Sequence, residues 1–191
     1  MTDYEKFVSN ESFFRAIGLY PPCDHDVAYF CTPLGAKLIG TLGVDGVSFC
    51  FVDGMGETVF CVSPSGTEAH YVFPIARDFR EFLSLSATLG NAGTAEQIMC
   101  LPRERFYEFF PVDRNVFEQK SAELCGFVLT RIEDPWEYVR DLARHFNYSA
   151  IKFSDEYYEV TGQENPRGKC ENPKDKKAYD FISTIEIEIK K

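Results

Sequence analysis

The triplet Asp24-His25-Asp26 is a place in this sequence where neighbouring side chains could do chemistry together. An imidazole beside two carboxylates could titrate near neutral pH, bind a metal or transfer a proton. In an extended chain, however, the two aspartates would share one face and His25 would point to the other. A solvated turn is therefore the favoured interpretation, with a reactive site as the alternative. Local structure explains His70 and His145 more simply, and neither a metal nor a cofactor is predicted.

The seven cysteines give a second set of candidate reactive groups. Their number is odd, they are widely spaced and no two form a CxxC pair, which argues against a disulfide framework and a zinc site. Cys50 and Cys61 lie within strand-like apolar runs, where a free cysteine behaves as a small buried hydrophobe. We expect reduced and mostly buried thiols. The cysteines are Cys23, Cys31, Cys50, Cys61, Cys100, Cys125 and Cys170.

Four acidic residues stand at or near predicted turns of a strand-rich region: Asp45, Asp53, Glu57 and Glu68. Clustered carboxylates on a rigid sheet can steer a basic partner and help to select it. We predict these four residues as a protein-binding site. A solvated surface that keeps the protein soluble is the alternative explanation for the same charges.

Composition limits the classes of function. The chain has 191 residues, is 45% apolar and 15% aromatic, and so can build the core of an ordinary domain. Its net charge of −10 disfavours nucleic acid as a partner. It has no apolar run of roughly 18–20 residues, the length that spans a membrane. Acidic residues near the start do not suit a signal peptide, so a cytoplasmic protein is expected.

Apolar spacing predicts the elements of the first part of the chain. A helix is expected over residues 3–17, followed by a proline-containing connector at 19–23. Glycines within Asp53–Glu57 predict a hairpin turn between two strands, and Pro64–Gly66 predicts another turn. Residues 33–42 suit either a short helix or no regular element, because three glycines interrupt the apolar positions. The four predicted strands cover residues 27–31, 47–52, 58–62 and 69–73.

Beyond residue 73 the apolar period becomes helical. Helices are expected over residues 74–89, 94–110, 113–129 and 134–146, with Pro102 interrupting or kinking the second. Helix, then strands, then helices is typical of an α+β fold, an antiparallel sheet of about four to six strands with helices packed on one side. Residues 1–160 would form this domain. A charged loop or linker would cover 161–177, and alternating isoleucines predict a strand within 178–191.

Within the segment 43–85, an apolar strand is expected to lead into a helix with the pattern Asp78-Phe-Arg-Glu-Phe-Leu83. In this arrangement the segment resembles the later part of the SUKH superfamily, which includes fungal cell-wall-synthesis regulators and many bacterial proteins. The resemblance implies a SUKH-like α+β fold without catalysis. It also implies an immunity protein that binds and neutralises a bacterial toxin. The stretches that carry it are Gly46–Asp53, Glu57–Val62, Tyr71–Ala76 and Asp78–Leu83.

We therefore expect a non-enzymatic protein-binding module whose partner is a protein, with a basic toxin domain as the class that the resemblance implies. Neither nucleic acid nor membrane is expected to bind. A small hydrolase or transferase that uses Asp24, His25 or His70 in a cleft beside the sheet is the alternative. A third interpretation is a piece of a larger protein, in which the strand predicted within 178–191 pairs with a missing neighbour.

Overall fold

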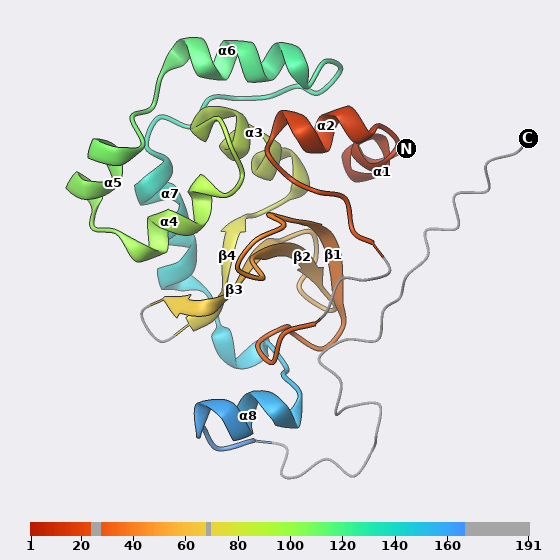
Figure 1. Cartoon of the computed structure of the whole chain (residues 1–191), viewed down its shortest axis with the longest axis vertical. Helices are drawn as coiled ribbons and strands as arrows, with labels where there is room; N and C mark the ends of the chain where they lie inside the picture. The colour runs from red at the N-terminus through yellow and green to blue at the C-terminus, as the bar shows by residue number, and fades with distance from the viewer. Residues whose placement is uncertain (24–27, 68–69, 167–191) are drawn as a thin grey trace, which may run out of the picture.

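The protein is an α+β structure built around one antiparallel sheet (Figure 1). The computed structural model describes residues 1–23, 28–67 and 70–166. Within these residues the strands are β1 (Ala36–Thr41), β2 (Ser48–Val52), β3 (Val59–Thr67) and β4 (His70–Ala76), in the spatial order β1-β2-β3-β4. Each strand thus pairs with its neighbour in the sequence, and the predicted fold class is confirmed.

Eight α-helices and one short 3-10 turn, η1, belong to the described part of the chain. Two helices precede the sheet and the rest follow it. Residues 162–166 contain neither helix nor strand. The helices are α1 (Asp3–Val8), α2 (Glu11–Ala16), α3 (Phe79–Leu89), α4 (Thr94–Cys100), α5 (Arg103–Phe109), α6 (Arg114–Glu123), α7 (Pro135–His145) and α8 (Asp155–Thr161), with η1 at Tyr148–Ala150. None of these helices is long and apolar enough to cross a membrane.

The larger core lies between the sheet and the helices that pack on one of its faces. Side chains alternate across each strand, so Phe49, Cys61 and Phe73 point from three strands toward the same helical layer. Phe82 of α3 is fully buried there, with its ring centroid 5.4 Å from that of Phe49. The packing of α3 against this face is therefore part of the larger core.

A second, smaller core covers the opposite face of the sheet. Cys50, Phe60 and Val62 point to this side, where they contact Tyr157 of α8 in one buried cluster. The segment before β1 is joined to the segment before α8 by a backbone hydrogen bond of 2.8 Å, in which Leu34 donates to the carbonyl of Lys152. Although most helices lie on one side of the sheet, both faces are thus covered.

Local capping signals explain where several helices begin. Asp78, Asp113 and Asp134 are the N-caps of α3, α6 and α7, and each carboxylate accepts a backbone N–H of the first turn. Gly90 ends α3 in the left-handed conformation, at φ 76°. Asp113, Asp134 and Gly90 stand at start and stop positions that the sequence predicts for helices, whereas the start capped by Asp78 was not predicted.

Several predicted boundaries are wrong, each for a local reason. The helix predicted over 3–17 is two helices, because the side chain of Asn10 accepts the amide of Ser12 and caps a new helix start. The described part of the strand predicted at 27–31 is a turn that buries Cys31. Residues 33–42, left open between a short helix and no regular element, contain strand β1.

The sheet also extends further than the sequence predicts. Pro74 pairs with Phe60 inside β4, so the following helix starts at Phe79 instead of residue 74. The predicted turn at 64–66 lies inside β3, where an irregularity between Val62 and Thr67 absorbs the proline and glycine. The break at Pro102 is confirmed, because that residue precedes α5. Helix α8, which was not predicted, ends at Thr161, where the charged loop was expected to begin.

Some predictions lie outside the described residues. These are the Asp24-His25-Asp26 triplet, Glu68, residues 167–177 of the charged loop and the strand predicted within 178–191.

Candidate functional site

The predicted acidic site is divided between two ends of the sheet. Asp53 and Glu57 are exposed and lie together in the turn that joins β2 to β3. Asp45 is exposed in the turn before β2, and the strand between them is five residues long, about 17 Å. Asp53 and Glu57 are thus neighbours, whereas Asp45 cannot share a small binding site with them.

Glu57 lines a cleft, here called the α1 cleft, with a volume of about 600 Å³. Its other walls come from α1, from the start of β1 and from the start of α3. Tyr4, Phe51 and Phe79 supply aromatic surface, with the Tyr4 ring centroid 5.2 Å from that of Phe51 and 5.3 Å from that of Phe79. Burial raises the pKa of Tyr4, which keeps its hydroxyl protonated at neutral pH.

The charges of the α1 cleft are of both signs and partly paired. Arg80 donates from Nε to Asp3 at 2.7 Å, and Asp78 is held by its capping role on α3. The ammonium nitrogen of Lys37 lies 4.6 Å from the centre of the Tyr4 ring. Within the described residues, neither Lys37 nor Glu57 has an ion-pair partner within 4.0 Å. Both charges are therefore available to an incoming ligand.

A second cavity, here called the aromatic cleft, has a volume of about 380 Å³ on the opposite face of the sheet. His70 lines it and stacks on Tyr148, with ring centroids 3.8 Å apart and an interplanar angle of 7°. Burial raises the pKa of Tyr148 to about 12. This cleft joins β4 with η1, α8 and residues 163–166, a segment that lies far from β4 in the sequence.

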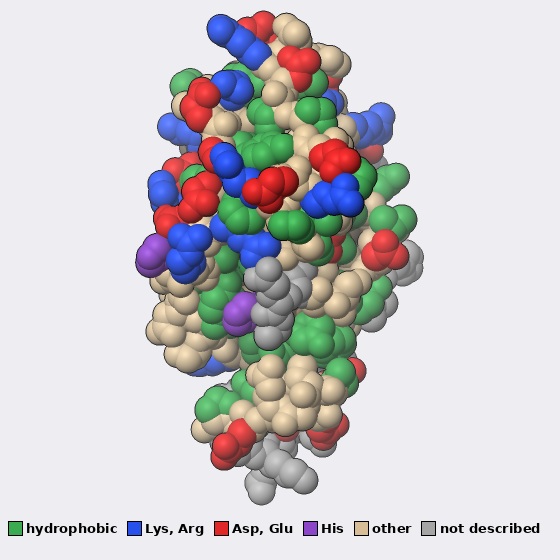
Figure 2. Space-filling model, turned by 90° about the vertical axis from the view of Figure 1, so that its left-hand side faces the viewer, with side chains coloured by type: hydrophobic (Ala, Val, Ile, Leu, Met, Phe, Trp, Pro, Cys, Tyr) green, Lys and Arg blue, Asp and Glu red, His purple; other side chains and the backbone are tan. Residues whose placement is uncertain are grey.

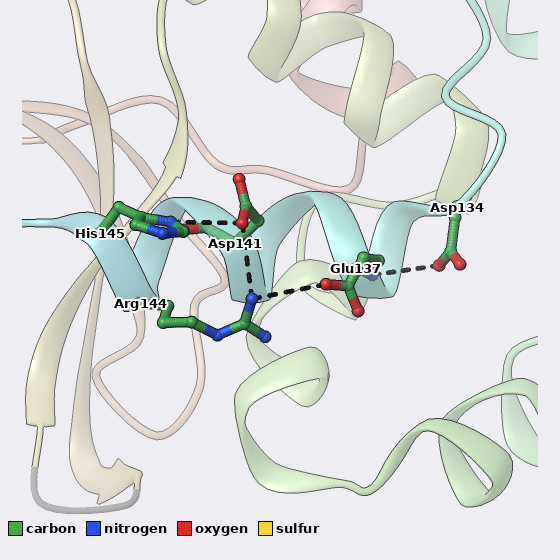
Figure 3. A network of polar contacts seen from close by, with 5 residues as sticks. All are labelled: Asp134, Glu137, Asp141, Arg144 and His145. Atoms are coloured by element: carbon green, nitrogen blue, oxygen red, sulfur yellow. Dashed lines mark hydrogen bonds and ion pairs between the residues drawn. The ribbon is translucent and has the colours of Figure 1, made fainter.

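His145, the other described histidine, belongs to a polar network on the exposed side of α7 (Figure 3). Its Nδ1 lies 2.9 Å from the backbone carbonyl of Asp141 and 3.2 Å from the carboxylate of the same residue. Arg144 bridges Asp141 and Glu137 on the same helix. The His145 side chain is 71% exposed, so this network fits helix stabilisation, with a cation near the C-terminal end.

Around α4, α5 and α7, acidic and basic side chains are interleaved over the surface (Figure 2). Asp134 is central to this region because it joins two helices. Its carboxylate caps α7, accepts from Arg103 of α5 at 2.7 Å and accepts from the Tyr107 hydroxyl at 2.6 Å. Partial burial raises the pKa of Asp134, but the hydrogen bonds from Tyr107, the Glu137 amide and Arg103 outweigh it and the net pKa is lowered.

Replacing Asp134 with alanine is expected to lower the free energy of unfolding by about 1–2 kcal/mol, because the cap of α7 is lost. Asp134→Asn, which keeps a capping oxygen, should cost less. Because the pKa of Asp134 is lowered in the folded state, its negative charge stabilises the fold at pH values above the unfolded-state pKa of about 3.9. This stabilisation is lost as the pH falls through the folded-state pKa. The difference in free energy of unfolding between the native chain and Asp134→Asn, measured with urea, should therefore shrink at acidic pH. A constant difference would contradict this role.

Burial makes the internal cysteines unsuitable as nucleophiles. Cys31, Cys50 and Cys61 are free and buried, and burial raises the pKa of Cys31 and of Cys50 to about 12. The pKa of Cys61 is also raised well above its usual value, first by burial. The prediction of core packing for Cys50 and Cys61 is thus confirmed. The expectation of mostly buried thiols holds for only half of the described set, because Cys23, Cys100 and Cys125 are exposed.

Comparison with known proteins gives no assignment. No family model, curated protein or solved structure matches this chain. Any function must therefore be derived from its own clefts and surfaces. Within residues 1–23, 28–67 and 70–166, no group of three or more His, Cys, Asp or Glu side chains could hold a metal ion.

Sequence reasoning identified Glu57 but missed the rest of the α1 cleft. Lys37 lies in a strand that was not predicted, while Tyr4 and Phe79 have the spacing of ordinary core residues. The aromatic cleft had one signal in the sequence: five aromatic residues occur between Phe146 and Tyr158. Chemically, the α1 cleft can accept a peptide-like ligand, since it combines aromatic surface with an available charge of each sign.

Proposed function

We propose that this protein is a non-enzymatic binding module that holds a segment of a protein partner in the α1 cleft. The observation that carries the proposal is the pairing of an aromatic surface with a polar margin in one cleft. Tyr4, Phe51 and Phe79 form the surface, and Glu57 and Lys37 supply the available charges. Aromatic residues surrounded by polar ones are typical of protein–protein interfaces.

The charges indicate the chemistry of the partner. Glu57 would pair with a basic side chain, with Asp53 adding to the negative potential of the same turn. Lys37 would donate to a carboxylate or a backbone carbonyl of the partner. The net charge of −10 favours approach by a basic protein. A basic toxin domain is the partner class that the SUKH resemblance implies, and an immunity role in the cytoplasm is part of this proposal.

The test is to identify the partner and then remove charge from the cleft. The full chain is immobilised, captured proteins are identified by mass spectrometry, and association rates with the purified partner are measured at several salt concentrations. The double variant Asp53→Asn/Glu57→Gln should slow association by about tenfold at low salt, with a smaller effect at high salt, because steering charges act mainly on the encounter rate.

Asp45→Asn is the control, and its effect is compared with that of the double variant per charge removed. It removes one exposed carboxylate from the far end of β2, and asparagine tolerates the positive φ of 56° at this position. We expect this variant to change the association rate far less than the cleft variant. Equal effects would indicate that only net charge matters, and an unchanged rate in the double variant would exclude the α1 cleft as the binding site.

A further inference from the structure

The aromatic cleft has features that the proposed partner-binding function does not use. Its lining includes Tyr71 of β4, Tyr148 of η1, Phe153, and Tyr157 and Tyr158 of α8. The cleft is about 380 Å³, within the range of roughly 300–1,000 Å³ that is usual for small-ligand sites. Three segments of the chain are therefore folded around one cavity with aromatic walls.

The rings hold one another in place around this cavity. Phe153 stacks on Tyr157 at 3.9 Å and 12°, while Tyr158 meets Tyr157 edge-on at 5.2 Å and 88°. The ring of Tyr71 is also perpendicular to that of Tyr157, with centroids 6.1 Å apart. Rings held in this way before binding lose little conformational entropy when a ligand binds.

Among the described residues, the charged side chain that lines the cleft is acidic. It is Glu164, which is exposed and has no ion-pair partner within 4.0 Å in this part of the chain. Residues 148–166, which supply most of the lining, contain four carboxylates and one lysine, Lys152. A cation is therefore attracted both by the net negative charge of this segment and by the aromatic lining, whereas an anion would be repelled.

We propose that the aromatic cleft binds an organic ammonium group bearing methyl substituents, with the tyrosine rings enclosing the methyl groups and Glu164 supplying the counter-charge. A methylated ammonium suits this cleft better than a bare one, because it is weakly hydrated and gives up little solvation on entering aromatic surroundings. The same chemistry occurs in free choline-type molecules and in methylated lysine side chains. The site is separate from the α1 cleft and does not depend on the function proposed for it.

The test compares choline with its uncharged carbon analogue, in which a tert-butyl group replaces the trimethylammonium group. Titration of the full chain, followed by NMR, should give saturable binding of choline and an upfield shift of its methyl protons from the surrounding rings. The carbon analogue should bind about tenfold more weakly. Equal affinity for the two molecules, or no saturable binding of choline or of a methylated peptide, would overturn the proposal.

Two peptides that differ only in trimethylation of one lysine distinguish the source of the ligand. Tighter binding of the methylated peptide than of choline would assign the site to a modified protein, and the reverse would assign it to a small molecule. Both results require the unmodified peptide to bind more weakly than the methylated one. Equal binding of the two peptides would contradict recognition of methyl groups.

Variants of the cleft provide the second measurement. Tyr158→Leu keeps apolar volume but removes one ring face, and should weaken choline binding by about tenfold. Glu164→Gln removes the counter-charge from an exposed residue without disturbing the core, and should weaken binding severalfold. Tyr20→Leu is the matched control, because Tyr20 is 63% exposed and does not line the cleft. Unchanged affinity in both cleft variants would also overturn the proposal.

Discussion

Replacing Phe82 with alanine is expected to lower the free energy of unfolding by about 3–5 kcal/mol. Phe82 is fully buried where α3 packs on the sheet, and its ring contacts those of Phe49 and Phe79. The substitution removes these contacts and leaves a cavity that the surrounding strands and helices can fill only in part. Since small domains are stable by about 5–15 kcal/mol, the loss is a large share of the total. Urea unfolding measures it directly.

Phe109→Ala is the control for this prediction. Phe109 carries the same side chain on α5 but is 60% exposed, so its removal should change stability by about 0.5 kcal/mol or less. A cost for Phe82→Ala no greater than for Phe109→Ala would show that α3 does not pack on the sheet as described.

Ser63→Ala is expected to cost about 2–3 kcal/mol, a large effect for the removal of a single oxygen. The Ser63 hydroxyl of β3 donates to the carboxylate of Glu96 in α4 at 2.5 Å, and both side chains are buried. Without the serine, one carboxylate oxygen loses its donor in surroundings that are largely shielded from water. A buried polar atom left without a partner costs more than a hydrogen bond normally contributes.

A double-mutant cycle separates this explanation from simple loss of packing. Glu96→Met replaces the carboxylate with an unbranched apolar side chain of similar length. In that background Ser63→Ala should cost much less than in the native chain, because no buried carboxylate remains to be satisfied. Additive costs, measured by urea unfolding of the four proteins, would contradict the proposed coupling.

The sequence predicts those parts of the fold that depend on local chemistry. The turn at Asp53–Glu57 needs positive φ, and glycines 54 and 56 adopt it at 80° and 65°. Asp134 starts a helix because its carboxylate reaches the amide of Glu137, only three residues away. Each of these features is decided within a few residues, and each is found where it was expected.

Strand β1 was missed because its glycines serve contacts with distant residues. A Cβ at Gly40 would lie 2.9 Å from the backbone oxygen of Tyr20, which pairs with the neighbouring Thr41. A Cβ at Gly35 would come equally close to the side chain of Asp53. Within the sequence alone these glycines only weaken a helix. In the folded chain these positions require glycine because distant segments approach the backbone closely, and the sequence alone does not reveal that approach.

The candidate sites also combine features that are decided locally with features that depend on contacts between distant residues. Exposed carboxylates at turns can be recognised from the sequence, so Glu57 was identified. Its neighbours across the α1 cleft, Lys37 and Arg80, lie about 20 residues away on either side and meet it only in the folded chain. The acidic site was also predicted too broadly, because turns at alternate ends of a meander are far apart even when they are close in sequence.

The order of the sheet has a consequence for how the chain folds. Because every strand pairs with its immediate successor, the whole sheet can assemble by zipping hairpins of low contact order, which is a rapid process. The hydrogen bond from Leu34 to Lys152 instead closes a span of more than a hundred residues. We therefore expect the aromatic cleft to mature late, after the hairpins, and to be among the first regions to open when the native state fluctuates.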